Sequence, residues 1–168
     1  QAVLSKTALV VGAEFYHALA FELGRALGVE LVCIASSSAP GRLRPLAHYS
    51  DGQMMAPVEF EVPPGHPCSQ VLGRGEPLLI EAGLQVSFPL GVCGRRDLDG
   101  YYGIPLRVGN RPAHCLLLIA STRPLRLEPL QFSLLNILAM RTEAELLREQ
   151  TETDRSEMQA RLFQSQKY

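Results

Sequence analysis

The sequence predicts an α+β fold built around a central antiparallel sheet. Helical patterns occupy the two ends of the chain, over residues 7–27 and from residue 128 onward. Between them lie two pairs of apolar segments with turn residues in the middle, over residues 29–50 and 101–121. Segments joined by a short turn pair antiparallel, so both pairs predict β-hairpins. Strands enclosed in sequence by helices are typical of the α+β class.

The first helix is predicted from apolar residues at every fourth position, which are Phe15, Leu19, Leu23 and Leu27. Gly28 follows, at a position where a left-handed backbone commonly ends a helix. Residues 29–36 are rich in β-branched and aliphatic side chains and predict a strand. Turn residues at 36–41 separate it from a partner strand over residues 42–50, which completes a hairpin.

The middle of the chain, residues 51–100, contains prolines throughout, and they exclude long regular elements. Short pieces are still predicted: extended segments at 58–62 and 77–81, and a helix over residues 67–72. Loops carry binding residues more often than the elements they join. We therefore expect this stretch to form the wall of any pocket.

The second hairpin is predicted from strands over residues 101–108 and 113–121, with Gly109 and Asn110 in the turn between them. The second strand is an almost continuous apolar run, which is typical of a strand at the centre of a sheet.

A long final helix is predicted to begin near Glu128. Its expected core stripe comprises Leu130, Leu134, Ile137, Ala144 and Leu147, widened by Leu135 and Leu138. From Arg148 onward the pattern is polar, which predicts an exposed helical extension or a coiled coil.

Composition narrows the class of partners. The chain has 168 residues, 46% of them hydrophobic, and a formal net charge of -1 at pH 7. The balanced charge disfavours nucleic acid as a partner. The apolar runs are far shorter than the ~20 residues of a membrane span, so no membrane contact is expected. Because the chain begins with Gln1 and carries no signal peptide pattern, we expect a piece of a longer, cytoplasmic protein.

Familiar catalytic and metal-binding signatures are missing from the sequence. It contains no CxxC pair, no HExxH, no P-loop and no Ser-His-Asp arrangement, so no catalytic residue and no metal ligand is predicted. Gly12 lacks the further glycines of a dinucleotide-binding turn, which favours a continuous helix there.

Two of the four cysteines are candidates for redox chemistry. Cys93 precedes two arginines, whose charges favour a reactive thiolate, and Cys68 lies near the start of the predicted middle helix. Cys33 and Cys115 lie within apolar strands and are expected to be small core residues. A structural role is favoured for Cys68 and Cys93 as well, because free cysteines are commonly buried.

Four segments, in this order, resemble those of GAF domains. GHPCSQV at 65–71 is similar to the family's short segment in which a cysteine opens the middle helix, and YYGIPLRVGN at 101–110 is similar to its aromatic-x-Gly-Val-Pro-Leu strand. HCLLLIASTRPL at 114–125 resembles the strand that leads to the last helix, and LLNILAMRTEAELLRE at 134–149 resembles that helix. The resemblance covers roughly residues 8–150.

The resemblance implies that the terminal helices pack on one face of the sheet and that loops cover a pocket on the other face. It places the pocket wall within residues 58–102. The pocket residues that it implies are Phe60, Cys68, Val71, Ile80, Phe88 and Tyr102.

GAF domains act as small-molecule sensors or dimerisation modules in larger signalling proteins, many of them bacterial, so the resemblance implies a regulatory and non-enzymatic role. We expect residues 1–147 to form the sensor domain and residues 148–168 to form a polar helical extension. That extension is expected to lead to an output domain such as a histidine kinase or a diguanylate cyclase. The expected partners are a second copy, bound through the terminal helices, and an unidentified small molecule.

Two alternatives stay open. Free methionine sulfoxide reductases are enzymes of GAF type that use cysteines in the pocket loops, which here implies Cys68 and Cys93. A ligand-free structural dimerisation module is the other alternative. The signature of cyclic-nucleotide-binding GAF domains and the Cys-His context of bilin-binding ones are absent, so the cofactor is unknown.

Overall fold

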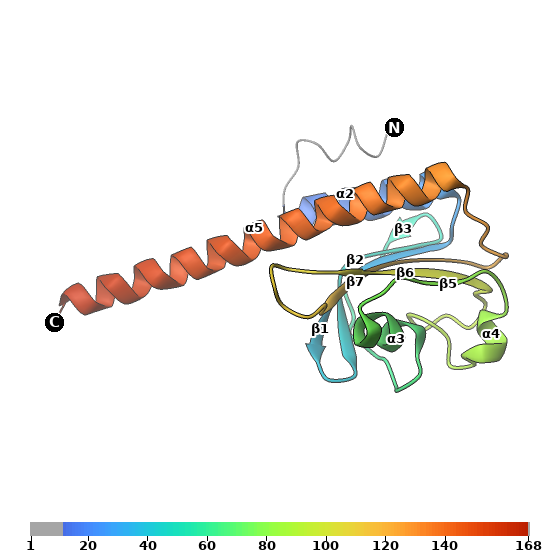
Figure 1. Ribbon diagram of the computed structural model, residues 1–168, viewed down its shortest axis with the longest axis horizontal. Helices are drawn as coiled ribbons and strands as arrows, with labels where there is room; N and C mark the ends of the chain where they lie inside the picture. The colour runs from blue at the N-terminus through green and yellow to red at the C-terminus, as the bar shows by residue number, and fades with distance from the viewer. Residues whose placement is uncertain (1–11, 168) are drawn as a thin grey trace.

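The computed structural model describes residues 12–167, which form one sheet with helices on both sides (Figure 1). The elements in chain order are α2 (Gly12–Leu27), β1 (Leu31–Ala39), β2 (Arg42–Ser50), β3 (Gln53–Met54), β4 (Phe60–Glu61), α3 (Pro67–Arg74), β5 (Leu78–Ile80), α4 (Leu84–Ser87), β6 (Gly100–Leu106), β7 (Cys115–Ser121) and α5 (Pro129–Lys167). The strand order is β3-β2-β1-β7-β6-β5, with β4 paired to β2 off this path, and every pairing is antiparallel. The predicted α+β fold is thus confirmed.

Both predicted hairpins are present around a central strand. β7 lies between β1 and β6, and all of its residues are buried, which explains its continuous apolar run. The connection from β6 to β7 is longer than the predicted turn, because β6 ends at Leu106 and β7 begins at Cys115. Gly28 has a φ of 65°, the predicted left-handed conformation after the first helix. The part of that helix predicted for residues 7–11 lies outside the described residues.

Regular structure in the middle of the chain is short, as its prolines require. α3 begins with a local cap, in which the Nδ1 atom of His66 accepts a hydrogen bond from the Cys68 backbone N–H at 3.1 Å. Pro67 occupies the first turn, where its missing N–H costs no helical hydrogen bond. Gly75, with a φ of 66°, ends the helix. The helix α4 has no counterpart in the sequence prediction.

The two faces of the sheet have separate cores. Helices α2 and α5 lie side by side over one face, and α3 and α4 lie on the other side (Figure 1). The helix-side core includes Phe15, Leu19, Leu23, Leu117, Leu135 and Leu138. The loop-side core includes Leu31, Cys33, Leu43, Cys68, Val71 and Tyr101. Each strand therefore contributes alternate side chains to two different cores.

The predicted core stripe of the last helix is right for Leu135 and Leu138, which are buried, and wrong for most of its main positions. Four of its residues are exposed: Leu130, Ile137, Ala144 and Leu147. The residues that α5 buries include Leu135, Leu138, Ala139 and Thr142. At 3.6 residues per turn these two sets lie on opposite sides of the helix. Because both sides carry apolar side chains, periodicity alone does not identify the side that packs on the sheet.

Helix α5 continues far beyond the sheet (Figure 1). Its 39 residues span about 58 Å at 1.5 Å per residue. Residues 151–166 are exposed along their whole length, so this part of α5 makes no core contact with the domain. None of the helices within residues 12–167 has the length and apolar character that a membrane span requires.

Candidate functional site

Five of the six predicted pocket residues lie on the loop side of the sheet. Cys68 and Val71, on α3, belong to the loop-side core and are fully buried. Phe60, Ile80 and Phe88 pack against that core from its edges and are partly exposed. The structure therefore brings together residues of β4, α3, β5 and the end of α4, and their role as ligand contacts stays a prediction.

Tyr102, the sixth predicted pocket residue, does not belong to this group. It lies in the helix-side core, where its ring meets the ring of Phe132 edge-on at 5.3 Å between centroids. Successive residues of a strand point to opposite faces, so its neighbour Tyr101 is the tyrosine of the loop side. Nothing in the sequence indicates which of the two tyrosines faces the loop side of the sheet.

The Tyr101 side chain occupies the space between the sheet and α3. It is fully buried, and its hydroxyl oxygen lies 3.4 Å from the Sγ atom of Cys68. The close approach depends on Gly103, where an added Cβ would lie 2.5 Å from the Tyr101 hydroxyl oxygen. Burial, and then the neighbouring thiols, hold the pKa of Tyr101 well above its usual range, so the hydroxyl stays protonated.

The predicted loop-covered pocket is thus filled by side chains of the protein itself. Leu84, Val92 and Leu98 close the loop-side core from the segments around α4 and are at most 1% exposed. A cavity of about 210 Å³ lies at the edge of this face, between residues 63–66 and 87–90. Of the predicted pocket residues, Phe88 lines it.

The thiols of Cys33, Cys68 and Cys93 lie in or against the loop-side core, and each raises the pKa of the Tyr101 hydroxyl. Interaction with the Cys33 thiol, and then burial, raise the pKa of Cys93, while burial raises that of Cys68. Sequence reasoning missed Cys33, because nothing in the sequence connects a residue of β1 with a turn 60 positions later.

The turn that carries Cys93 is tied to the end of β2. Arg95 donates hydrogen bonds to Ser50 Oγ at 3.1 Å and to Asp51 Oδ1 at 3.0 Å, and it also pairs with Asp97 at 2.7 Å. The side chain of Arg95 is only 17% exposed. Its positive charge is therefore balanced by two carboxylates and is not free to stabilise a Cys93 thiolate, as the sequence had suggested.

His48 lies on the same face as the thiols. It is directly opposite Cys33 in the pairing of β1 with β2, and opposed residues point to one side of a sheet. Its Nε2 atom is buried and has no hydrogen-bond partner within the described residues. Burial, and then the charge of Arg95, lower the pKa of His48, so the imidazole is neutral at pH 7. No group of three His, Cys, Asp or Glu side chains in residues 12–167 is arranged to hold a metal ion.

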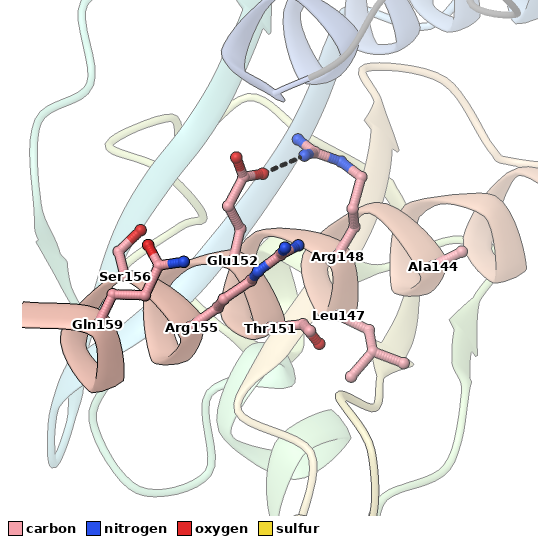
Figure 2. A pocket seen from close by; sticks show the side chains of 8 residues that line it. All are labelled: Ala144, Leu147, Arg148, Thr151, Glu152, Arg155, Ser156 and Gln159. Carbon is pink, nitrogen blue, oxygen red and sulfur yellow. Dashed lines mark hydrogen bonds and ion pairs between the residues drawn. The ribbon is translucent and has the colours of Figure 1, made fainter. Parts of the chain in front are cut away.

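A second candidate surface lies on the outer side of α5, away from the sheet. A groove of about 730 Å³ runs along this helix, and Figure 2 shows the side chains that line it. Its lining residues are Ala144, Leu147, Arg148, Thr151, Glu152, Arg155, Ser156 and Gln159. Steps of three and four residues place all of them on one side of the helix. One ion pair among these residues joins Arg148 to Glu152, one turn further along the helix, at 2.7 Å (Figure 2).

No family model and no curated protein matches the sequence of this chain. Solved structures do resemble its fold. The GAF domain of an Acinetobacter phosphoenolpyruvate-protein phosphotransferase has a TM-score of 0.69 at 14% identity, over 91% of this chain and 93% of that one. The phycocyanobilin-bound GAF domain of a cyanobacterial phytochrome has a TM-score of 0.69 at 10% identity, over 90% of this chain and 95% of that one. A type II free methionine-R-sulfoxide reductase from Thermoplasma acidophilum has a TM-score of 0.61 at 16% identity, over 79% and 93%.

Proposed function

We propose that this chain, which has the fold of GAF domains, is a regulatory module of a bacterial, cytoplasmic signalling protein. It dimerises along the outer side of α5 and passes its conformational state through that helix to an output domain. The observation that carries the proposal is an exposed apolar strip on α5, opposite the side that packs on the sheet.

The outer strip of α5 comprises Leu130, Ile137, Met140, Ala144, Leu147, Met158 and Leu162. With 3.6 residues per turn, these positions fall within a strip about 100° wide. Leu130 and Met140 are 73% and 67% exposed. Side chains this exposed contribute little free energy of apolar burial to the stability of the monomer. An unpartnered apolar strip of this length is typical of a helix that packs against another helix.

A second copy of α5 is the partner that the strip fits. Leu130, Ile137 and Ala144 follow each other at intervals of seven residues, and the series continues through the polar Thr151 to Met158. This is the repeat of a coiled coil, in which each apolar knob fits between four residues of the facing helix. Two copies of the strip, related by a two-fold axis, can bury each other's apolar side chains, so no other protein is needed to cover them.

The inner side of α5 connects the dimer to the domain. The Arg107 backbone N–H donates a hydrogen bond to Glu143 at 2.7 Å, and the Gly12 N–H at the start of α2 donates one to Glu145 at 3.2 Å. A shift of the sheet or of α2 therefore acts on the same turns of α5 whose outer side meets the partner. A ligand or modification that favours one arrangement over another biases the dimer through this helix.

The packed loop-side core favours a second candidate function, a ligand-free dimerisation module. The Tyr101 ring, whose hydroxyl lies 3.4 Å from the Cys68 Sγ atom, is buried in the space where the predicted pocket would lie. Native mass spectrometry of the protein isolated from cells tests this: a stoichiometric small molecule contradicts the ligand-free module and supports a sensor.

We expect no methionine sulfoxide reductase activity from this chain. Burial raises the pKa of the Cys68 thiol, and a protonated thiol is a poor nucleophile. Incubation with free methionine sulfoxide and a thiol reductant is expected to give no methionine. Turnover that disappears in Cys93→Ser would instead support the enzyme alternative.

Sedimentation velocity tests the dimer directly. The full chain is expected to sediment as a dimer, and Met158→Glu, alone or with Ile137→Glu, is expected to shift it toward the monomer. Thr153→Glu is the matched control: it adds the same charge to the exposed tail on the opposite side of the helix and is expected to leave the dimer intact. A monomeric wild-type chain, or equal effects of Met158→Glu and Thr153→Glu, would contradict the proposal.

A further inference from the structure

We propose that a cavity between the sheet and α5 binds a small zwitterion, with a cationic N–H group of the ligand on Glu149 and its carboxylate on Arg44. The cavity lies on the helix side of the sheet, opposite to the predicted pocket of the loop side. Binding of the ligand does not depend on dimerisation, whereas the effect of the ligand on the dimer rests on the proposed function.

The floor of the cavity is a row of residues across three neighbouring strands. Ser36 of β1 lies opposite Arg44 of β2 in one pairing and opposite Cys115 of β7 in the other. Directly opposed residues point to the same face of a sheet, and Cys115 belongs to the helix-side core. The side chains of Ser36, Arg44 and Cys115 therefore all face α5, and all three line the cavity.

The roof of the cavity is the last inner part of α5 before the exposed tail. It comprises Leu146, Glu149, Gln150 and Thr153, which steps of three and four residues place on one side of the helix. The volume is about 240 Å³, below the range of about 300–1,000 Å³ that is typical of pockets for drug-sized ligands. The lining extends from the exposed Thr153 to the buried Cys115, so a small molecule can enter without opening the core.

Glu149 supplies an acceptor that the protein leaves without a donor. Its Oε1 atom is buried and has no hydrogen-bond partner within residues 12–167. The acidic residues before and after it along α5, Glu145 and Glu152, both pair with Arg148. A buried carboxylate oxygen costs free energy unless a donor reaches it, and hydrogen bonds from cationic N–H groups are the strong ones. Glu149 therefore favours the positively charged end of a ligand.

Tyr16 of α2 adds a second buried polar group without a partner on this side of the sheet. Its hydroxyl has no hydrogen-bond partner within the described residues, although the residue is only 3% exposed. Burial, and then the Glu149 carboxylate, raise the pKa of Tyr16, so the hydroxyl stays protonated. The helix-side core thus contains an unused O–H donor in addition to the unused acceptor of Glu149.

Arg44 supplies the opposite charge. Of the described residues that line the cavity, Arg44 and Glu149 are the two with a Lys, Arg, Asp or Glu side chain. No ion pair joins the Arg44 guanidinium to another residue of the described chain. A guanidinium matches a carboxylate through two parallel N–H bonds. A ligand with a single charge would meet one like charge in this cavity, whereas a zwitterion matches both side chains.

A ligand held by both side chains links β2 to α5 at the point where α5 leaves the domain. Glu149 is half-buried, and residues 151–166, which follow it, are exposed. A bound zwitterion therefore favours arrangements of α5 in which Glu149 stays close to Arg44, and it disfavours the others. The direction in which the tail leaves the domain, and with it the geometry of the dimer, is the property that the ligand would regulate.

The experiment titrates the full wild-type chain with glycine, β-alanine and γ-aminobutyrate, in which the ammonium and carboxylate groups lie progressively farther apart. Backbone amide NMR signals are followed during the titration. At least one of the three is expected to bind saturably at millimolar concentration and to shift the signals of residues that line the cavity. Acetate and methylamine carry one charge each, and glycine betaine carries both charges without an N–H donor. These three are expected to bind at least about tenfold more weakly.

Matched variants identify the cavity independently. Glu149→Gln and Arg44→Met each remove one charge and are expected to weaken binding of the zwitterion at least about tenfold. Glu152→Gln and Arg155→Met remove the same charges from the outer groove of α5 and are expected to leave binding unchanged. Thermal melting without ligand shows that each variant is folded.

Three results would overturn the proposal: no saturable binding by any of the three zwitterions, equal binding by the compounds with one charge, or a larger loss in the outer-groove variants than in the cavity variants. Sedimentation of the ligand-free chain tests the dimer separately. A monomer that binds the zwitterion contradicts the dimer alone, and a dimer that binds none contradicts this proposal alone.

Discussion

Tyr101 and Gly103 act together on β6. The tyrosine ring fills the space beneath α3, and its hydroxyl lies over the glycine two residues later. A methyl group at position 103 would lie 2.5 Å from the tyrosine oxygen and 2.9 Å from Val71 Cγ2, both shorter than van der Waals contact. The closed loop side therefore depends on a residue without a side chain.

Gly103→Ala is expected to destabilise the domain by about 1–3 kcal/mol, because the ring or α3 must shift to make room. Denaturant unfolding measures the free energy. Gly73→Ala is the control, since Gly73 is an exposed helical residue with open space around its Cα. That variant is expected to be neutral or more stable by up to about 1 kcal/mol. Equal losses in the two variants would show that the Tyr101 contact is not limiting.

Glu30 connects the start of β1 with the end of β7. One of its oxygens accepts hydrogen bonds from the Thr122 N–H at 2.7 Å, the Thr122 hydroxyl at 2.6 Å and the Ser121 hydroxyl at 3.2 Å. Partial burial opposes ionisation of this carboxyl, but the hydrogen bonds outweigh it and lower the pKa of Glu30 below its usual 4.5. A depressed carboxyl pKa adds stability above pH 4.5 that is lost as the pH falls through the folded-state value.

Glu30→Gln is accordingly expected to lower the unfolding free energy at pH 7, and to lower it less at an acidic pH below the folded-state pKa of Glu30, where the wild-type carboxyl is protonated. Thermal or denaturant unfolding at the two pH values measures both differences. Glu157→Gln, on the exposed tail of α5, is the control and is expected to change neither. A difference that is the same at both pH values would contradict this account of Glu30.

At the scale of elements, α5 has apolar side chains on two opposite sides, one packed on the sheet and one exposed. Its inner side packs on the sheet through Leu135, Leu138 and Ala139, and its outer side carries the exposed strip. The last inner contacts come from Glu145, which pairs with Arg148 at 2.8 Å, and from the half-buried Glu149. Residues 151–166 are exposed, and none of them belongs to the buried core.

Two truncations test where the domain ends. A chain ending at Gln150 keeps every inner contact of α5 and is expected to melt as cooperatively as the full chain, within a few degrees of it. A chain ending at Leu147 loses the Arg148 partner of Glu145 and is expected to fold with a lower midpoint. Both lose the distal part of the outer strip and are expected to associate more weakly by sedimentation. Loss of cooperative melting in the longer truncation would contradict this boundary.

At the scale of the whole molecule, stability is expected to be highest in the centre of the sheet and lowest in the tail. β7 is buried on both faces and is hydrogen-bonded on both sides, whereas residues 151–166 are exposed. Hydrogen exchange is expected to be slowest in β7 and fastest in the tail when the protein is dilute. If the proposed dimer forms, the tail gains a partner, so its protection is expected to rise with protein concentration while that of β7 does not. Concentration-independent exchange in the tail would argue against a coiled-coil dimer.

The order of elements was predictable because local patterns decide it. The continuous apolar run of residues 113–121 identified the central strand, and the Pro67 segment identified α3, since capping and burial leave direct marks in the sequence. The GAF fold followed from the order of four such segments. Only the tertiary structure decided which of two neighbouring tyrosines faces α3, because alternation along a strand defines two sets of residues without assigning either to a face.

The same reasoning applies to the helix and to the thiols. Periodicity revealed apolar residues along α5 but not which of its two sides meets the sheet, since that depends on the surface opposite. Cys33 looked like any small core residue, yet Cys93, 60 positions later, packs against the core to which Cys33 belongs, and Arg95 ties the turn that carries Cys93 to the end of β2. The sequence by itself therefore determined the fold and the central strand, whereas contacts between distant segments decided how the loop-side core packs and which side of α5 stays exposed.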